Sequence, residues 1–345
     1  MKISVCVPTY KRPIMLNSLI LSFLNQDFHD SELCIVDDNS QDNTKEIVSQ
    51  FQRKDSRIKY FYNDSNIGFS KNFLKSIMMS TGEFVVTLGD DDLLLRRDAL
   101  RTYVKIFESF PDVYFVYSNL TQVDSNNAFD FAHRFFEKDI LLASGKESLS
   151  QMWLRSMVIS GMGLRKFNGI EQLYPKQDML FPQVEFIGRI LLNHSAYGVA
   201  SYLCGFRAHE QQLGYFAIKG KRIKSYEQHS NIELFSIWKK LHEAAPETVP
   251  NKNIIEKHLI SSFTTNVINE KIRVGNRRVT QNMLMLQERS LNARFSLPLW
   301  SSFIASILVP SRFLRVIKNQ TKHLIINKFY KNEKDDFEKL EIGLG

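Results

Sequence analysis

The sequence predicts an α/β fold in which a mainly parallel sheet is flanked by helices, with a helical extension at its C-terminal end. Strand-like and helix-like segments alternate over roughly the first 120 residues. Beyond residue 221, apolar residues recur mainly at spacings of three and four, which is typical of helices. Because strands joined through helices return the chain to the same edge of a sheet, the first pattern indicates right-handed crossovers and parallel strands.

The expected elements can be placed in chain order. Strands are expected over 2–7, 31–36, 58–62, 83–88, 113–117 and 196–206. Helices are expected over 14–24, 44–52, 72–79, 99–107 and 181–192, and then over 223–244, 254–272 and 279–291. Residues 118–148 are expected to form a partly ordered segment. We therefore expect a domain over 1–220, with halves at 1–120 and 121–220, and a helical region over 221–345.

Positive charge is concentrated near the C-terminal end. The chain of 345 residues carries a formal net charge of +8, yet 251–332 alone holds 14 Lys and Arg against three Asp and Glu. Within 297–331 an apolar stretch containing Trp300 precedes a basic helix with an apolar face, which favours contact with an anionic membrane surface. A helix docked on the protein with its basic face in water is the alternative. We expect no nucleic-acid binding, because no recognition motif accompanies the charge.

Several features predict the compartment. No run of about 18 apolar residues is present, so a spanning helix is not expected. The N-terminal residues lack the apolar core and cleavage site of a signal peptide. Three cysteines without paired or metal-type spacing are typical of a reducing compartment. We expect a cytoplasmic protein that is peripheral on the inner face of the plasma membrane.

Polar clusters follow each of the first four predicted strands. They comprise residues 9–12, 37–42, 66–72 and 90–92. The carboxyl ends of parallel strands lie at one edge of a sheet, where ligands bind in such folds. The four clusters are therefore expected to converge on a single site.

The last of these clusters is three consecutive aspartates, Asp90, Asp91 and Asp92. Adjacent carboxylates repel one another, so a folded protein needs a cation beside them. Oxygen ligands suit Mg²⁺ or Mn²⁺, whereas the structural alternative is a solvated acidic turn. In an extended segment Asp90 and Asp92 face the same way, and in a tight turn Asp91 and Asp92 act together. Asp92 is the expected metal ligand in both cases, with Asp90 as the second candidate.

Four motifs in order carry a resemblance to a known family. They read V-P-T-Y-K-R, I-V-D-D-N-S-Q-D, N-I-G-F-S-K-N and G-E-F-V-V-T-L-G-D-D-D. Over about residues 1 to 120 the chain resembles the nucleotide-sugar-binding half of the family 2 glycosyltransferases, which have the Rossmann-like GT-A fold. The family signature usually has Gly where Asn39 stands and Arg where Lys71 stands. The resemblance implies an inverting transfer of a sugar from a nucleotide diphosphate, here a UDP-sugar, to a glycan or lipid-linked glycan in bacterial surface polysaccharide or glycoconjugate assembly.

The resemblance also suggests how the donor is held. Asp38 is expected to accept the imide N–H of a uracil base, and the first aspartates to meet the ribose hydroxyls. The remaining expected donor-binding residues are Pro8, Thr9, Tyr10, Arg12, Asn66, Gly68, Lys71, Asn72 and Arg207. Structural alternatives exist for four of them: Tyr10 packing on the next loop, Arg12 solvated at a helix start, and Asn66 and Asn72 bracing their loop.

The expected acceptor side follows residue 120. Gly161 and Gly163 permit close backbone approach in a strand that lies beside the acceptor in this family. Glu185, at the margin of an apolar helix face, is the expected general base, with Asp178 in reserve; an ion pair with Arg189 is the alternative for Glu185. His209 is a further candidate metal ligand, although a lone His is more often structural.

Two other functions fit parts of the pattern. A sugar-1-phosphate nucleotidyltransferase also uses Asp-bound Mg²⁺, but its Gly-rich phosphate loop is missing at residues 8–10. A non-catalytic nucleotide-sugar-binding scaffold would need no general base, and two acidic candidates are present. No pattern indicates an oligomeric state.

Overall fold

The computed structural model describes residues 1–123, 129–177, 179 and 181–207, and a few helical positions beyond them. The chain divides into two compact units, Met1–Glu210 with Leu340–Gly345, and Gln211–Lys339. The strands and helices below all belong to the first unit. The predicted boundary after residue 220 lies outside the described residues and stays a prediction.

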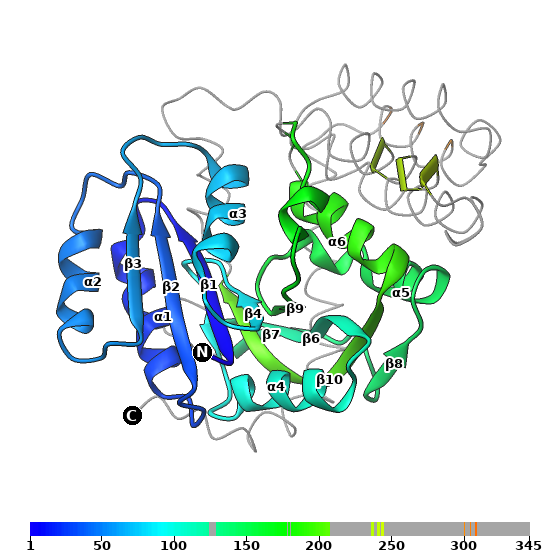
Figure 1. Cartoon of the computed structure of the whole chain (residues 1–345), viewed down its shortest axis with the longest axis horizontal. Helices are drawn as coiled ribbons and strands as arrows, with labels where there is room; N and C mark the ends of the chain where they lie inside the picture. Colours follow the sequence, from blue (N-terminus) through cyan, green and yellow to red (C-terminus); the bar gives the residue numbers. More distant parts are fainter. Residues whose placement is uncertain are drawn as a thin grey trace. The chain divides into compact units, whose positions relative to one another are not determined.

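The first half of this unit alternates strands and helices as the sequence predicts (Figure 1). β1 pairs in parallel with β2 and with β4, and β2 pairs in parallel with β3. Only the helix after β3 departs clearly, because it begins three residues before its predicted start. The elements are β1 (Ile3–Thr9), α1 (Pro13–Leu24), β2 (Ser31–Asp37), α2 (Thr44–Gln52), β3 (Ile58–Tyr62), α3 (Phe69–Met79) and β4 (Phe84–Thr87).

The direction in which the chain crosses the sheet decides which face each helix covers. From β1 to β3 the chain moves outward, and after α3 it returns to β4 on the other side of β1. Right-handed crossovers therefore place α1 and α2 on one face, where they pack together, and α3 on the other. Strands covered on both faces bury all their side chains, and every residue of β1 and β2 is buried.

The second half is less regular. Its strands are β5 (Leu93–Leu94), β6 (Val113–Val123), β7 (Phe129–His133), β8 (Ile140–Leu142), β9 (Met162–Arg165) and β10 (Ser195–Arg207). Its helices are α4 (Ala99–Ser109), α5 (Lys146–Met152) and α6 (Pro182–Asn193), with short 3-10 helices η1 (Arg155–Met157) and η2 (Ile170–Leu173). The expected partly ordered segment over 118–148 contains the end of β6, β7, β8 and the start of α5, although 124–128 lie outside the described residues.

The sheet has the strand order β3-β2-β1-β4-β9-β6-β10-β5, with β7 beside β6 and β8 beside β10. β9 runs antiparallel to both β4 and β6, so β6 has the direction of β1 to β4, and β10 pairs in parallel with β6. The described strands thus confirm a mainly parallel α/β sheet flanked by helices. The carboxyl end of β10, at Arg207, consequently lies at the same edge as the carboxyl ends of β1 and β4.

Gly163 allows α4 to approach the centre of the sheet. A Cβ atom at this position of β9 would lie 2.7 Å from the ring of Tyr103, so a larger residue has no room. The Tyr103 hydroxyl donates a 2.8 Å hydrogen bond to the carbonyl of Gly161. Gly163 therefore accommodates the ring of Tyr103 from a helix of the same unit, and the place of this strand beside the acceptor stays a prediction.

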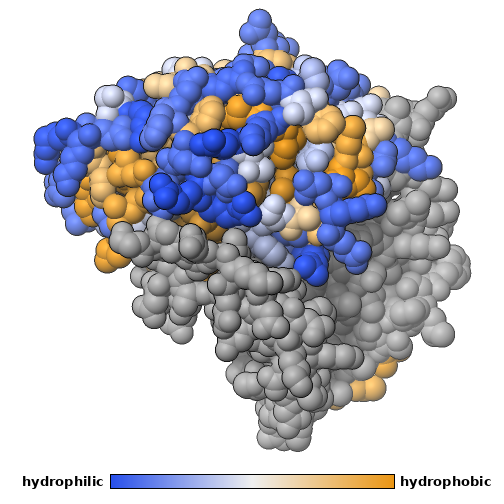
Figure 2. Space-filling view, turned by 90° about the horizontal axis from the view of Figure 1, so that it is seen from below, coloured by the Kyte–Doolittle hydropathy of each residue, from blue (hydrophilic) through white to orange (hydrophobic). Residues whose placement is uncertain are grey.

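Other predictions concern the surface and the second unit. The three cysteines are free and buried. Ile14 and Leu21 are among the exposed apolar side chains. The face in Figure 2 shows hydrophobic patches interspersed with hydrophilic residues, as is ordinary for a protein surface. In the second unit the described positions within the predicted helix 223–244 are helical, with Ile237 and Leu241 buried one turn apart. Within the part of the chain that can be described, none of the helices has the length and apolarity needed to cross a bilayer.

Candidate active site

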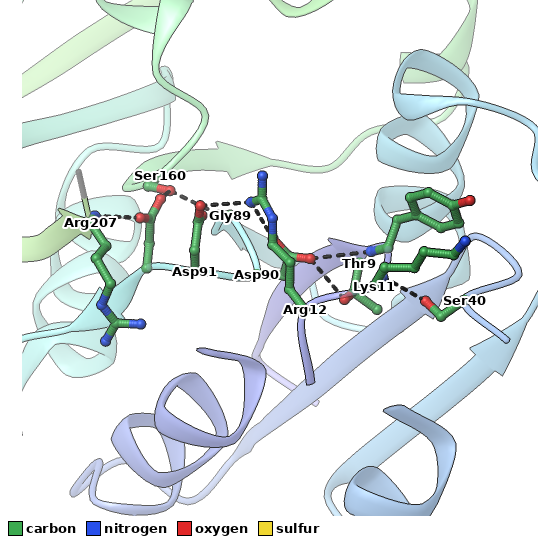
Figure 3. Close-up of polar contacts among 11 residues, drawn as sticks. Thr9, Lys11, Arg12, Ser40, Gly89, Asp90, Asp91, Ser160 and Arg207 are labelled. Atoms are coloured by element: carbon green, nitrogen blue, oxygen red, sulfur yellow. Dashed lines mark hydrogen bonds and ion pairs between the residues drawn. The ribbon is translucent and has the colours of Figure 1, made fainter. Parts of the chain in front are cut away.

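Hydrogen bonds join the four polar clusters that the sequence placed at strand ends. Thr9, at the end of β1, donates from Oγ1 to Asp90, which follows β4, over 2.8 Å. The amide of Lys11 donates to Ser40 Oγ, after β2, over 2.9 Å. The loop before α3 joins through the amide of Gly68, which donates to Asp38. The predicted convergence on one edge is confirmed, and Figure 3 shows the contacts among the loops after β1, β2 and β4.

Arg12 supplies the cation that the aspartates need. Its Nη1 lies 2.9 Å from Asp90 Oδ1 and 2.6 Å from Asp91 Oδ2, and the three side chains are largely buried. Burial raises the pKa of the Asp90 carboxyl to about 6 although Arg12 lies beside it. Arg12 is therefore not a solvated helix-start residue. From the loop after β1 it bridges the carboxylates of Asp90 and Asp91, as Figure 3 shows.

Asp92 points to a different set of partners. Residues 89–92 form a tight turn closed by a 3.0 Å hydrogen bond from the Asp92 amide to the Gly89 carbonyl, which is the second of the two predicted geometries. Ser160 donates to Asp92 Oδ2 and the amide of Arg207 donates to Oδ1 over 2.8 Å. Burial, and then the neighbouring Asp91, raise the pKa of this carboxyl well above its ordinary value.

The chemistry of this donor set fits a divalent cation that arrives with a substrate. The described residues contain no group of three or more His, Cys, Asp or Glu able to hold a metal alone. Mg²⁺, however, is typically bound by one or two carboxylates plus the phosphates of a substrate. Asp92 is a buried carboxylate to which no cationic side chain of the described residues donates a hydrogen bond, and its charge is the one a cation would stabilise.

Asp38 is held by the loop before α3. Its Oδ1 accepts the Ile67 amide over 2.7 Å and the Asn63 side chain over 3.0 Å, and its Oδ2 accepts the Gly68 amide over 2.9 Å. An ionised carboxylate has about four acceptor positions, so one remains on Oδ2 for an imide N–H. Gly68 has φ +84, a backbone conformation that glycine adopts readily. The amide that donates to Asp38 Oδ2 belongs to this same residue.

Asparagines brace this corner of the site. Asn66 donates to the Asp38 carbonyl, and Asn72 donates to the Val36 carbonyl while accepting from Asn63. The bracing alternative is thus the one the geometry shows for Asn66 and Asn72. Asn39, where the family signature has Gly, adopts φ +66, a conformation that Asn tolerates better than most residues.

The remaining expected donor residues line the same edge. Pro8 is the register partner of Val36 between β1 and β2. Tyr10 is half-buried, its amide donates to Asp90 over 3.2 Å, and the Lys11 ammonium lies over its ring. Lys71 is exposed in the first turn of α3. Their roles in donor binding stay predictions.

The expected general base lies in the first turn of α6. The side chain of Glu185 is 1% exposed, and its Oε1 lies 2.5 Å from Arg189 Nη2. The ion pair that the sequence offered as an alternative is therefore present, but the glutamate is buried rather than a surface residue. Asp178 and His209 lie outside the described residues, so their expected roles stay predictions.

Sequence reasoning missed three residues that shape the site: Ser40, Asn63 and Ser160. Each is a small polar residue whose partner is distant in the chain. Ser160 links Asp92 to Gly89, whose amide donates to its Oγ over 2.8 Å. Its position just before the Gly-rich strand was the only available signal.

A sheet of this topology, with polar side chains gathered at the carboxyl ends of its parallel strands, has the edge at which open α/β proteins bind their ligands. Within that class, residues 4–173 match the model of "Glycosyl transferase family 2". These residues, about half of the chain, belong to glycosyltransferase family 2, and the predicted family and GT-A fold are confirmed.

Curated relatives agree with this assignment. The chain is 38% identical over 139 residues to "GalNAc(5)-diNAcBac-PP-undecaprenol beta-1,3-glucosyltransferase" of Campylobacter jejuni, covering 40% of this chain and 44% of the relative. It is 36% identical over 117 residues to "Abequosyltransferase RfbV" of Salmonella typhimurium, covering 33% of this chain and 35% of the relative. The matched part thus spans less than half the length of these relatives.

Solved structures share the fold. S. aureus TarS 1-349 in complex with UDP-GlcNAc covers 93% of this chain and 92% of its own, with 17% identity and a TM-score of 0.61. A mannosyltransferase from Pyrobaculum calidifontis in complex with GDP-Man and Mn²⁺ covers 97% of this chain and 87% of its own, with 16% identity and a TM-score of 0.51.

Proposed function

We propose that this glycosyltransferase is metal-dependent and inverting, and that it moves a sugar from a UDP-sugar to a hydroxyl group of a lipid-linked glycan. The observation that carries the proposal is the series of hydrogen bonds that joins the loops after β1, β2, β3 and β4: Thr9 to Asp90, the Lys11 amide to Ser40, and the Gly68 amide to Asp38. The UDP-GlcNAc bound to TarS and the undecaprenol-linked acceptor in the name of the Campylobacter relative support the choice of substrates.

The nucleotide binds at Asp38 and the neighbouring loop before α3. Asp38 accepts the base N–H at the acceptor position left on Oδ2, beside the amides that fix its carboxylate. Tyr10 gives the base a flat face, and Asp90 or Asp91 accepts hydrogen bonds from the ribose hydroxyls. Arg12 keeps these two carboxylates together before the donor binds, because it neutralises their repulsion.

Departure of the nucleoside diphosphate falls to Asp92. This residue would hold Mg²⁺ or Mn²⁺ together with the donor phosphates, and the cation would neutralise the charge that develops on the leaving group. Ser160 and the Arg207 amide fix the orientation of the carboxylate for that role. Lys71 lies exposed on α3 and adds a positive charge for the diphosphate.

Activation of the acceptor falls to Glu185 or Asp178. A base on the face opposite the leaving group takes the proton of the attacking hydroxyl as the new bond forms, which inverts the anomeric centre. Glu185 would have to exchange its contact with Arg189 for the acceptor hydroxyl, since apo geometry of catalytic groups often tightens only with substrate. His209 is proposed as a further ligand at the metal.

Membrane contact is proposed for the basic segment over 297–331, which would place the enzyme on the inner face of the plasma membrane. Trp300, Ile304 and Leu308 are helical and four residues apart, so they share one helix face. Ile304 is 50% exposed and Leu308 is 74% exposed, as an interfacial helix requires. Full-length protein should float with anionic liposomes, and the double variant Ile304→Asp with Leu308→Asp should not. Wild-type protein that stays in the soluble fraction would overturn this part.

The experiment that tests the proposed function is release of nucleoside diphosphate from a panel of donor sugars, with Mn²⁺, Mg²⁺ or EDTA. We expect release from at least one UDP-sugar, and loss of release in EDTA. A GDP-sugar as the sole productive donor would overturn the nucleotide assignment. Full turnover in EDTA would overturn the metal dependence.

A further inference from the structure

The acceptor side of the site contains a half-buried arginine that pairs with none of the described acids. Arg155 belongs to η1, and its guanidinium lies 4.3 Å from the centre of the Phe135 ring. Among the described residues its side chain forms neither a hydrogen bond nor an ion pair. Burial lowers the pKa of this guanidinium below its ordinary value. Removing a cation from water without a counter-ion is unfavourable, so the structure maintains this arrangement at a cost.

Two segments of the chain connect Arg155 to Asp92. Five residues after Arg155 in the same loop, Ser160 donates to Asp92. On the other path, Phe135 stacks with His133, His133 contacts Phe206, and the next residue, Arg207, donates its amide to Asp92. Ser160 and Arg207, both labelled in Figure 3, thus donate to the Asp92 carboxylate from two segments of the chain. The cluster of His133, Phe135, Arg155 and Phe206 therefore borders the aspartates.

Tyr117 packs against the aromatic part of this cluster. Tyr117 lies 5.9 Å from Phe135 between ring centres, and its hydroxyl donates to the Val158 carbonyl. Burial is the main cause of the raised pKa of that hydroxyl, and the charges of Arg155 and Asp92 act on it in opposite directions. The charges of both Arg155 and Asp92 thus affect the pKa of Tyr117.

A second observation shows that the aromatic wall is built rather than incidental. Asn119 is fully buried and accepts the amides of Phe135 and Phe136, at 2.6 Å and 2.9 Å. Its side-chain amide donates to the carbonyls of Phe136 and Ala200. Three of these hydrogen bonds fix the turn that carries Phe135, and the fourth ties Asn119 to β10. The ring therefore covers one face of the guanidinium, while the N–H edge of a stacked arginine remains suited to an anion.

We propose that Arg155, stacked on Phe135, binds a phosphate group of the acceptor substrate. This inference rests on the proposed function and adds a subsite to it. In the sheet, the donor elements β1 to β4 lie on one side of β9, and β6 and β10 lie on the other, so we assign an anion at Arg155 to the second substrate. Planar, bidentate recognition of phosphate by Arg explains why an uncompensated guanidinium is kept here. Exposed Met157 and Val158, in the same loop, offer apolar contact beside it.

The test measures binding of inorganic pyrophosphate by calorimetry while saturating UDP and Mg²⁺ fill the donor site. Wild-type protein should bind pyrophosphate under these conditions. Arg155→Gln should weaken that binding about tenfold or more and leave the affinity for UDP unchanged, because a charge-assisted contact is lost only at the acceptor side. Arg53→Gln, which removes an exposed positive charge next to α2, is the matched control and should behave as wild type.

The outcomes separate the sources of phosphate. Pyrophosphate that UDP displaces completely from the wild type would show that only the donor site binds it and would overturn the subsite. An equal loss in Arg155→Gln and Arg53→Gln would reduce the effect to overall charge and would also overturn it. Should Arg155→Gln fail to fold, Arg155→Lys, which keeps the charge but not the planar fork, must bind more weakly than wild type. A wild type that does not bind UDP would overturn the proposed function itself.

Discussion

The two halves of the first unit reach the same site by different structural routes. From β1 to β4, each polar cluster follows a parallel strand, and neighbouring loops are fixed by backbone amides that donate to carboxylates, as at Asp38. From β6 to β10, the sheet is mixed, β10 is displaced in register three times along β6, and side chains such as Asn119 fix the turns. The donor half is thus ordered by topology, whereas the acceptor half depends on individual buried polar residues.

The largest effect is expected at the boundary between the halves. Asp92→Asn keeps the size of the side chain, and its oxygen can still accept from Arg207, but it removes the negative charge that would bind a cation. Turnover of the UDP-sugar should fall by about 100-fold or more, which corresponds to roughly 3 kcal/mol of transition-state stabilisation. Steady-state release of UDP measures it.

The control for this substitution is Asp64→Asn, which removes the same charge from an exposed loop position. It should retain wild-type turnover. Equal activity of Asp92→Asn and Asp64→Asn would contradict the role given to Asp92 and remove the link between the halves.

The next effect separates the halves by stability. Asn119→Ala leaves two buried amides and two carbonyls without partners and should lower the free energy of unfolding by about 3 kcal/mol. Urea denaturation measures the loss. Asn193→Ala, at an exposed position at the end of α6, should lie within about 0.5 kcal/mol of wild type. If the acceptor half is separate, the affinity of Asn119→Ala for UDP should stay unchanged; a loss of UDP binding would show that the halves are not separable.

A smaller effect tests the donor half. Gly68→Ala puts a side chain at φ +84 and ψ 159, and should destabilise the fold by about 2 kcal/mol and weaken UDP binding, because the Gly68 amide supports Asp38. Gly169→Ala introduces a side chain at the same φ of +84 but on the acceptor half. It should lose stability without losing UDP affinity. If both variants weakened UDP binding equally, backbone strain would account for the loss, and the loop before α3 would have no specific role in binding UDP.

The smallest effect concerns the opposite end of the donor strands. Glu32 is buried, yet its pKa lies below the ordinary value: burial raises it, but hydrogen bonds from Thr81 and Ser4 outweigh burial. A lowered folded-state pKa gives stability that is present above the unfolded value of about 4.5 and is lost as pH falls through the folded value. The free energy of unfolding of the wild type should exceed that of Glu32→Gln by about 1 kcal/mol at pH 7, and this difference should shrink below pH 4.5.

Denaturation of both proteins across pH 3 to 7 measures this, with Glu46→Gln, exposed on α2, as control. A difference that does not change with pH would mean that the Glu32 hydrogen bonds do not depend on its charge.

The contrast between the halves also explains how far the sequence could predict the structure. Alternating periodicities specify β1 to β4 and their helices, because a parallel sheet leaves little freedom in order or handedness. Asp38 and Asp92 could be singled out because motifs at strand ends must share an edge. The bridging of Asp90 and Asp91 by Arg12 was not foreseen, since it depends on a side chain from a different loop. β7, β8 and Ser160 were missed because short antiparallel segments and single serines leave no periodic signal.

The central claim is that donor and metal meet at Asp92. The direct measurement is calorimetric titration of UDP into wild type and Asp92→Asn, each with Mn²⁺ and with EDTA. The account predicts that Mn²⁺ strengthens UDP binding by about tenfold or more in the wild type and has little effect in Asp92→Asn. Equal enhancement by Mn²⁺ in both proteins would contradict it.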